Sequence, residues 1–142
     1  MADELREILR GGITFTAYAD EAIDSGDLVK ASGSDDVVTS DGGYTTSDIH
    51  VSMCDASGDD QYCVGIALED ASAAGDYITV STEGLYIMRT SEGITPGEGV
   101  CANESDPQEV DMLDSGEEHF KIGTALTGAS AADKYIIVLL RI

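Results

Sequence analysis

The chain has 142 residues, and 42% of them are hydrophobic, which is enough for one folded domain with its own core. Its 28 Asp and Glu residues against 7 Lys and Arg give a formal net charge of −21. Nucleic acid and anionic membrane are therefore excluded as expected partners, because both bind basic surfaces. The charge is typical either of a disordered acidic chain or of a folded protein in concentrated salt, and ordered apolar runs such as YIIVLL favour the second.

The first residues, MADELREILRGG, predict a short N-terminal arm over residues 1–12. Leu5, Ile8 and Leu9 would share one face of a short helix that ends at Gly11 and Gly12. The arm is either a frayed terminus or a segment that docks on a partner. It has no apolar core of a signal peptide, and no stretch of the chain approaches the roughly 18 apolar residues of a membrane span. We therefore expect a soluble protein made inside a cell.

Alternating apolar and polar residues predict strands from Ile13 onward. ITFTAYA has the period of two that marks a half-buried strand, and GDLVKAS follows a turn as the next strand. Residues 32–60 form an acidic insert rich in Gly, Ser and Asp, in which VVTS and IHVSM are either parts of an exposed loop or edge strands. YCVGIAL, and a strand pair in YITVSTEGLYIMRT broken near Glu83, continue the pattern. The sequence therefore predicts an all-β fold.

The last segment, YIIVLLRI, is apolar at successive positions. Such a run is typical of a strand covered on both faces, by the core on one side and by chain or another subunit on the other. We expect core and oligomer contacts from this strand, at Tyr135, Ile136, Ile137, Val138, Leu139 and Leu140.

The chain contains an internal duplication. VGIALEDASAAGDYITV (64–80) and IGTALTGASAADKYIIV (122–138) agree at ten of seventeen positions, and a weaker match links the segments that begin at Ile13 and Gly84. In the weaker match both copies contain a turn of the form I-x-x-G-[DE]-x-V, whose Gly permits positive φ. In the stronger match both copies contain the phrase ASAA, which predicts a small-residue corner. We therefore predict one domain over 13–142, a compact β-barrel or sandwich-like fold built from two tandem modules, 13–80 and 84–138.

Catalytic and metal-binding patterns are weak. His50 and His119 lie in no nucleophile or metal spacing, and the many adjacent carboxylates indicate a solvated surface. The spacing of His50, Cys54 and Cys63 matches no common zinc finger. The three cysteines leave open a Cys54–Cys63 disulfide or, as an odd count favours, small buried thiols. We expect no enzyme and no cofactor, apart from cations held loosely at acidic clusters.

The phrases VGIALEDASAAGDYITVSTEGLY, GITPGEGV and KIGTALTGASAADKYIIVLLRI together resemble the small capsid decoration proteins of tailed viruses. The matching positions are Gly65, Ala67, Leu68, Glu69, Asp70 and Ala71 in the first phrase, Ile94, Gly97 and Val100 in the turn, and Gly123, Ala125, Leu126 and Ala129 in the last. The acidic insert and the ELREIL start depart from the family pattern.

This resemblance implies a β-rich virion protein that binds the major capsid protein on the outer surface of an icosahedral shell as a homotrimer. It would stabilise the shell against internal DNA pressure. By analogy with the family's N-terminal arm, Leu5, Ile8, Leu9, Ile13 and Phe15 are the expected capsid-docking residues. The acidic composition also resembles that of haloarchaeal proteins, which suggests a haloarchaeal virus. The alternative is a β-rich adhesion or carbohydrate-binding module on a spike or cell surface.

Overall fold

The computed structural model describes residues 6–10, 13–32 and 49–142, and these residues form strands and short 3-10 turns. The strands are β1 (Arg6–Arg10), β2 (Thr14–Ala19), β3 (Leu28–Ala31), β4 (His50–Met53), β5 (Cys63–Ala67), β6 (Tyr77–Ser81), β7 (Glu83–Thr90), β8 (Gly99–Ala102), β9 (Glu109–Met112), β10 (Gly123–Ala125) and β11 (Tyr135–Arg141). The 3-10 turns are η1 (Asp59–Gln61) and η2 (Glu118–Phe120). None of the helical segments in these ranges is long and apolar enough to cross a membrane.

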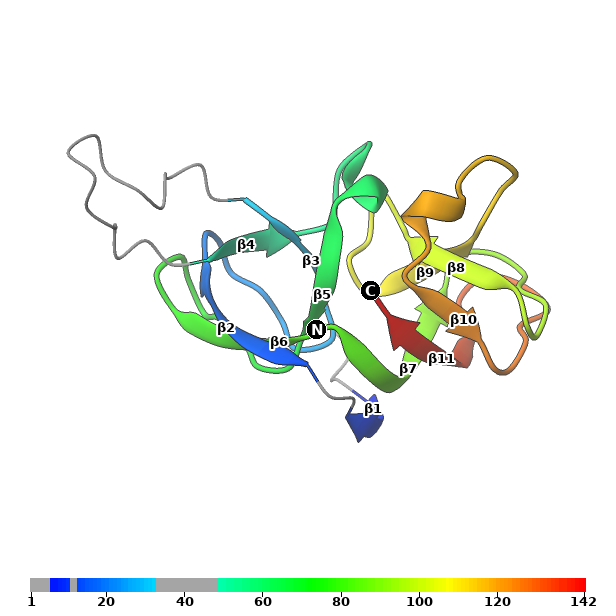
Figure 1. The fold of residues 1–142 in the computed structure, drawn as a ribbon, viewed down its shortest axis with the longest axis horizontal. Helices are drawn as coiled ribbons and strands as arrows, with labels where there is room; N and C mark the ends of the chain where they lie inside the picture. Colours follow the sequence, from blue (N-terminus) through cyan, green and yellow to red (C-terminus); the bar gives the residue numbers. More distant parts are fainter. Residues whose placement is uncertain (1–5, 11–12, 33–48) are drawn as a thin grey trace.

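The strands form two five-stranded barrels that lie side by side (Figure 1). The first barrel closes in the order β2-β4-β3-β5-β6. The second has the order β7-β11-β10-β8-β9 and closes through a parallel pair between β7 and β9, while β1 adds to β7 along its earlier residues. The predicted all-β fold made of two tandem β modules is confirmed.

The two barrels repeat the same strand registers. Thr16 pairs with Thr79 in the first barrel, and Ile87 pairs with Ile137 at the same place in the second. The isolated bridge between Ile23 and Ala71 likewise recurs between Ile94 and Ala129. The duplication seen in the sequence therefore extends to individual backbone pairs.

The I-x-x-G-[DE]-x-V turn has the geometry that its glycine predicts. Gly26 and Gly97 adopt φ of 95° and 91°, a conformation that side chains rarely allow. Their N–H groups donate to the carbonyls of Ala67 and Ala125, each at 2.8 Å. These hydrogen bonds tie the turn to the end of β5 in the first barrel and to the end of β10 in the second.

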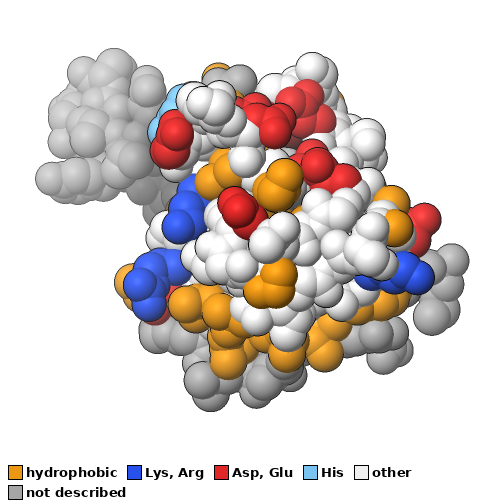
Figure 2. All heavy atoms as spheres, turned by 90° about the vertical axis from the view of Figure 1, so that its right-hand side faces the viewer, with side chains coloured by type: hydrophobic (Ala, Val, Ile, Leu, Met, Phe, Trp, Pro, Cys, Tyr) orange, Lys and Arg blue, Asp and Glu red, His pale blue; other side chains and the backbone are white. Residues whose placement is uncertain are grey.

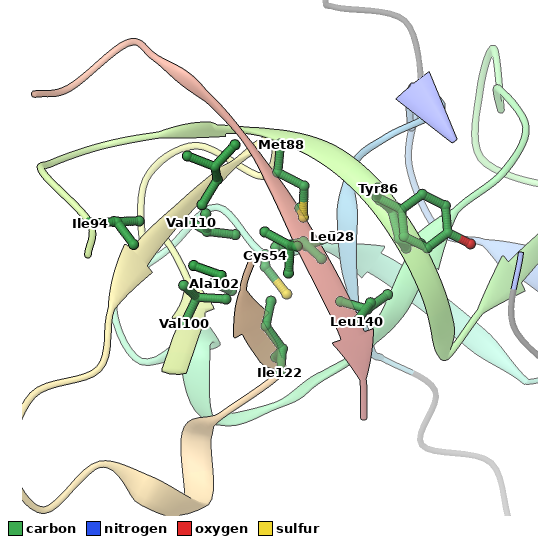
Figure 3. Close-up of a cluster of buried hydrophobic side chains, with 14 residues drawn as sticks. Leu28, Cys54, Tyr86, Met88, Ile94, Val100, Ala102, Val110, Ile122 and Leu140 are labelled. Atoms are coloured by element: carbon green, nitrogen blue, oxygen red, sulfur yellow. The ribbon is translucent and has the colours of Figure 1, made fainter. Parts of the chain in front are cut away.

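The cores of the barrels are not separate. One cluster of nine buried side chains fills the first barrel, and the larger cluster fills the second (Figure 3). Leu28, Cys54 and Ile66 come from strands and turns of the first barrel but pack in the second cluster. In addition, the Leu28 N–H donates to the carbonyl of Pro107 at 2.7 Å. Apolar packing and backbone pairing therefore join the two barrels.

Several local expectations need correction. The predicted N-terminal helix is wrong, since residues Arg6–Arg10 form strand β1, which pairs antiparallel with β7 along one edge. IHVSM is neither an exposed loop nor an edge strand, because it contains β4, which lies between β2 and β3 and helps to close the first barrel. VVTS lies outside the described residues. All three cysteines are free, with Cys54 and Cys101 buried and Cys63 partly exposed.

Candidate docking face of the second barrel

Strand β11 has two different faces. Ile136, Val138 and Leu140 point into the second barrel and are fully buried. The alternate residues Ile137 and Leu139 face outward and are partly exposed, and Tyr135 is 42% exposed. The apolar run therefore serves the core with every second residue and presents the others on the outer surface.

Strand β7 extends this surface. Leu85 pairs with Leu139 and Ile87 pairs with Ile137, so these side chains lie next to each other on the outer side of the sheet. Both β7 residues are partly exposed, whereas their neighbours Tyr86 and Met88 are buried. We call this surface the outer apolar face and define it by Leu85, Ile87, Tyr135, Ile137 and Leu139.

Of the five positions of this face, the first barrel has an apolar side chain only at Tyr77, which corresponds to Tyr135 and is 56% exposed, although its strands have the same registers. The residues that correspond to Leu85, Ile87, Ile137 and Leu139 are small and hydroxyl-bearing: Thr14, Thr16, Thr79 and Ser81. Ser81 is buried, whereas Thr14, Thr16 and Thr79 are exposed or partly exposed. The two modules thus differ in chemistry at outward-facing positions. Because the fold itself does not require apolar side chains there, the outer apolar face calls for a role outside the barrel.

Charge is also unevenly distributed between the two repeats of the sequence. Residues 13–82 contain 14 acidic and 1 basic residue, and residues 83–142 contain 11 acidic and 4 basic residues. Six of the seven basic residues lie in, or within two residues of, β1, β7, β10 or β11. Figure 2 shows hydrophobic side chains along the lower edge of the molecule, where Figure 1 has β1, β7 and β11, with acidic side chains above them.

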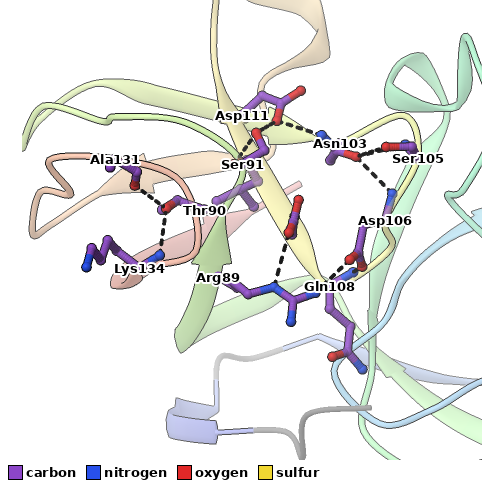
Figure 4. A network of polar contacts seen from close by, with 12 residues as sticks. Arg89, Thr90, Ser91, Asn103, Ser105, Asp106, Gln108, Asp111, Ala131 and Lys134 are labelled. Carbon is purple, nitrogen blue, oxygen red and sulfur yellow. Dashed lines mark hydrogen bonds and ion pairs between the residues drawn. The ribbon is translucent and has the colours of Figure 1, made fainter. Parts of the chain in front are cut away.

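A polar network holds the end of β7 (Figure 4). The guanidinium of Arg89 donates from Nη2 to Asp106 Oδ2 at 2.6 Å and from Nε to Glu109 Oε1 at 3.2 Å. Partial burial and the neighbouring Asp106 raise the pKa of Glu109, and Arg89 opposes this effect. The charge of Arg89 is thus used inside the fold.

Amide and hydroxyl groups also hold the segment 103–111, which contains Asp106 and Glu109. The Asn103 Oδ1 atom accepts from the backbone N–H groups of Ser105 and Asp106, both at 2.8 Å. Asn103 Nδ2 donates to Asp111 Oδ1 at 2.9 Å, and the Ser91 hydroxyl binds the same carboxylate oxygen. Residues 103–111 are therefore held against the end of β7, beyond the outer apolar face.

The residues expected to dock on a capsid occupy different surroundings. Leu5 lies outside the described residues, while Ile8 and Leu9 lie in β1, where Leu9 pairs in register with Leu85. Ile13 is 58% exposed. Phe15 is partly buried and packs against the core of the first barrel. The structure thus places the backbone of β1 beside the outer apolar face, but it packs Phe15 against the core of the first barrel.

His50 belongs to an aromatic group on the first barrel. Its ring lies 4.5 Å from that of Tyr18, which in turn meets Tyr77 edge to face. His50 Nδ1 lies 2.6 Å from Asp20 Oδ1, and hydrogen bonds from Ser32 and His50 lower the pKa of Asp20 against the opposing effect of burial. Across the described ranges, no three His, Cys, Asp or Glu side chains are placed to hold a metal ion.

Comparison with known proteins gives this surface its context. A sequence profile described as phage cement protein matches residues 10–142. The chain belongs to the phage cement protein family. It is therefore a structural virion protein associated with a phage capsid, and the family is one of structural proteins. No curated relative matches the sequence.

A solved structure shares the fold of this cement protein. It is described as the head fiber gp8.5 N base in bacteriophage phi29. The match has a TM-score of 0.54 and 17% sequence identity, and it covers 90% of this chain and 92% of that one. At this identity the likeness establishes the shared arrangement of strands across nearly all of both chains.

Proposed function

We propose that the chain is a non-enzymatic decoration protein that binds the outer surface of the capsid through the outer apolar face. The observation that carries the proposal is the difference between the duplicated barrels. At matched outward positions the first has Thr16 and Thr79, and the second has Ile87 and Ile137. Removing these isoleucine side chains from water on a partner would stabilise a complex by about 25 cal/mol for each Å² buried.

The proposal extends to assembly on the shell. A homotrimer that bridges neighbouring capsid subunits would add contacts that internal DNA pressure has to break before the shell opens. The membership of the phage cement protein family supports this role. The net charge of −21 per chain opposes self-association, and salt screens this repulsion. A haloarchaeal host cell would supply the salt, and we include a virus of such a host in the proposal.

The test of docking compares shell binding by matched variants. The double variant Ile87→Thr/Ile137→Thr gives the second barrel the residues found at the same positions of the first. We expect its affinity for empty shells of the virus, measured by co-sedimentation, to fall by about tenfold or more, because apolar area is lost from the contact. The control Thr16→Ser/Thr79→Ser, on the first barrel, should leave binding unchanged. Equal binding by the isoleucine double variant and the unmodified chain would overturn the assignment of the face.

The test of assembly is the solution mass. Light scattering after size exclusion, in about 2 M and about 0.1 M KCl, spans the range over which exposed charges become screened. We expect a trimer in the concentrated salt and dissociation in the dilute buffer. A monomer under both conditions would contradict a trimer formed before docking.

A further inference from the structure

Beside the outer apolar face lies a hollow with two basic side chains. It has a volume of about 230 Å³ and is lined by Lys121, Gly123, Thr124, Leu139 and Arg141. Leu139 belongs both to this hollow and to the outer apolar face, so the two are continuous. The wall is formed by the pairing of β10 with β11, in which Thr124 lies opposite Leu139.

Lys121 and Arg141 differ from the basic residues that the fold uses. Lys30 Nζ lies 2.7 Å from Asp59 Oδ1, and Arg89 binds two carboxylates. In contrast, neither Lys121 nor Arg141 forms an ion pair with a carboxylate among the residues that the structure describes. Both are exposed. In a chain with 28 acidic residues, two adjacent cations that face a hollow and have no acid partner there are a distinctive feature.

The size of the hollow limits what it can hold. Sites for small molecules and cofactors usually have about 300–1,000 Å³, so this hollow is better suited to one or two side chains of a protein partner. A carboxylate can accept hydrogen bonds from both an ammonium and a guanidinium group. Its aliphatic stem would then lie against Leu139, at the border of the outer apolar face.

We propose that the hollow receives an Asp or Glu side chain of the capsid protein, held between Lys121 and Arg141. This inference rests on the proposed function, since it names the chemistry of the partner at the same docking face. Docking removes the three charged groups from solvent. Salt screens the attraction between such buried groups less than it screens the attraction of an exposed pair. The apolar contact supplies affinity, and the carboxylate fixes which residue of the partner lies over β10 and β11.

The first test measures binding to empty shells. The double variant Lys121→Gln/Arg141→Gln should bind at least about tenfold more weakly than the unmodified chain, because hydrogen bonds to charged groups are lost. Lys134→Gln is the matched control, since Lys134 is an exposed lysine at the start of β11 that does not line the hollow. It should bind as the unmodified chain does. Equal binding by the double variant, with an unchanged thermal midpoint, would overturn the inference and leave docking through the apolar face standing.

The second test examines the hollow without the capsid. N-acetylglutamate is titrated into the isotope-labelled chain, and N-acetylglutamine serves as the uncharged probe. We expect amide shifts at Gly123, Thr124 and Leu139 with the first probe only, and their loss in the double variant. Absence of these shifts would overturn the inference. If they appear but the unmodified chain does not bind shells, the proposed function fails while the carboxylate site stands.

Discussion

The buried carboxyl of Asp27 predicts that the stability of the fold depends on pH. Its side chain is 2% exposed, and Oδ2 accepts a hydrogen bond from the N–H of Asp24 at 2.9 Å. A hydrogen bond also links it to Gln108 of the second barrel. Burial nevertheless raises the pKa of Asp27 to about 6, against the lowering effect of these two hydrogen bonds. Compared with the unfolded chain, the folded chain thus favours the protonated form of the Asp27 carboxyl.

The size of the effect follows from the difference in pKa between the folded and unfolded chain. An unfolded Asp has a pKa of about 3.9, so the difference of about 2 units corresponds to about 3 kcal/mol. Because the folded pKa is the higher one, this stability is fully present below about pH 3.9 and is lost as the pH rises through 6. Asp27→Asn keeps the hydrogen-bond acceptor and removes the charge. We therefore expect the variant to be more stable than the unmodified chain at pH 7, by up to about 3 kcal/mol.

The assay is chemical denaturation of both chains between about pH 4 and pH 7.5, in about 1 M KCl so that repulsion among the other acids is screened. The difference in free energy of unfolding should be near zero at the acidic end and grow through pH 6. Asp76→Asn is a control of opposite sign. Asp76 is exposed and its pKa is lowered by hydrogen bonds from Ser72, so its variant should lose stability at neutral pH. A difference between Asp27→Asn and the unmodified chain that does not change with pH would refute the reasoning.

Two further predictions concern the second barrel. Gly123→Ala should lower the free energy of unfolding by about 2 kcal/mol or more, since the added Cβ would lie 2.4 Å from the carbonyl oxygen of Leu139. Gly93→Ala, whose Cβ would meet nothing closer than 3.5 Å, should change it by less than about 0.5 kcal/mol, and an equal loss in both would contradict the steric argument. Leu140→Ala should cost about 2–5 kcal/mol, because Leu140 is fully buried and leaves a cavity. Leu126→Ala, at a site 47% exposed, should be nearly neutral in the same denaturation assay.

The choice between helix and strand at the N-terminus could not be predicted from local sequence. Residues 6–10 fit an amphipathic helix, yet they form β1 because β7 offers backbone groups along its earlier residues. The closure of each barrel by a parallel pair, β2 with β4 and β7 with β9, is likewise a contact between distant segments. Local periodicity carries no information about such pairs.

Only part of the candidate site could be predicted from the sequence. YIIVLLRI predicts an apolar strand, but an unbroken apolar run does not reveal which alternate residues face the core. Comparison of the two repeats at Thr16 and Ile87, or Thr79 and Ile137, contains the missing signal once the register is known. The hollow between Lys121 and Arg141 has no counterpart in any local motif.

By itself, the sequence determined the duplication, the strand-rich class and the glycine turns, because repeated phrases, period-two alternation and the φ of glycine are local properties. Only the tertiary structure decided which face of β11 meets the core and which remains outside. It also brought Lys121, from the segment before β10, next to Arg141, at the end of β11. The physical reason is that sidedness and charge clustering depend on strand order and register, which non-local backbone pairing and burial determine together.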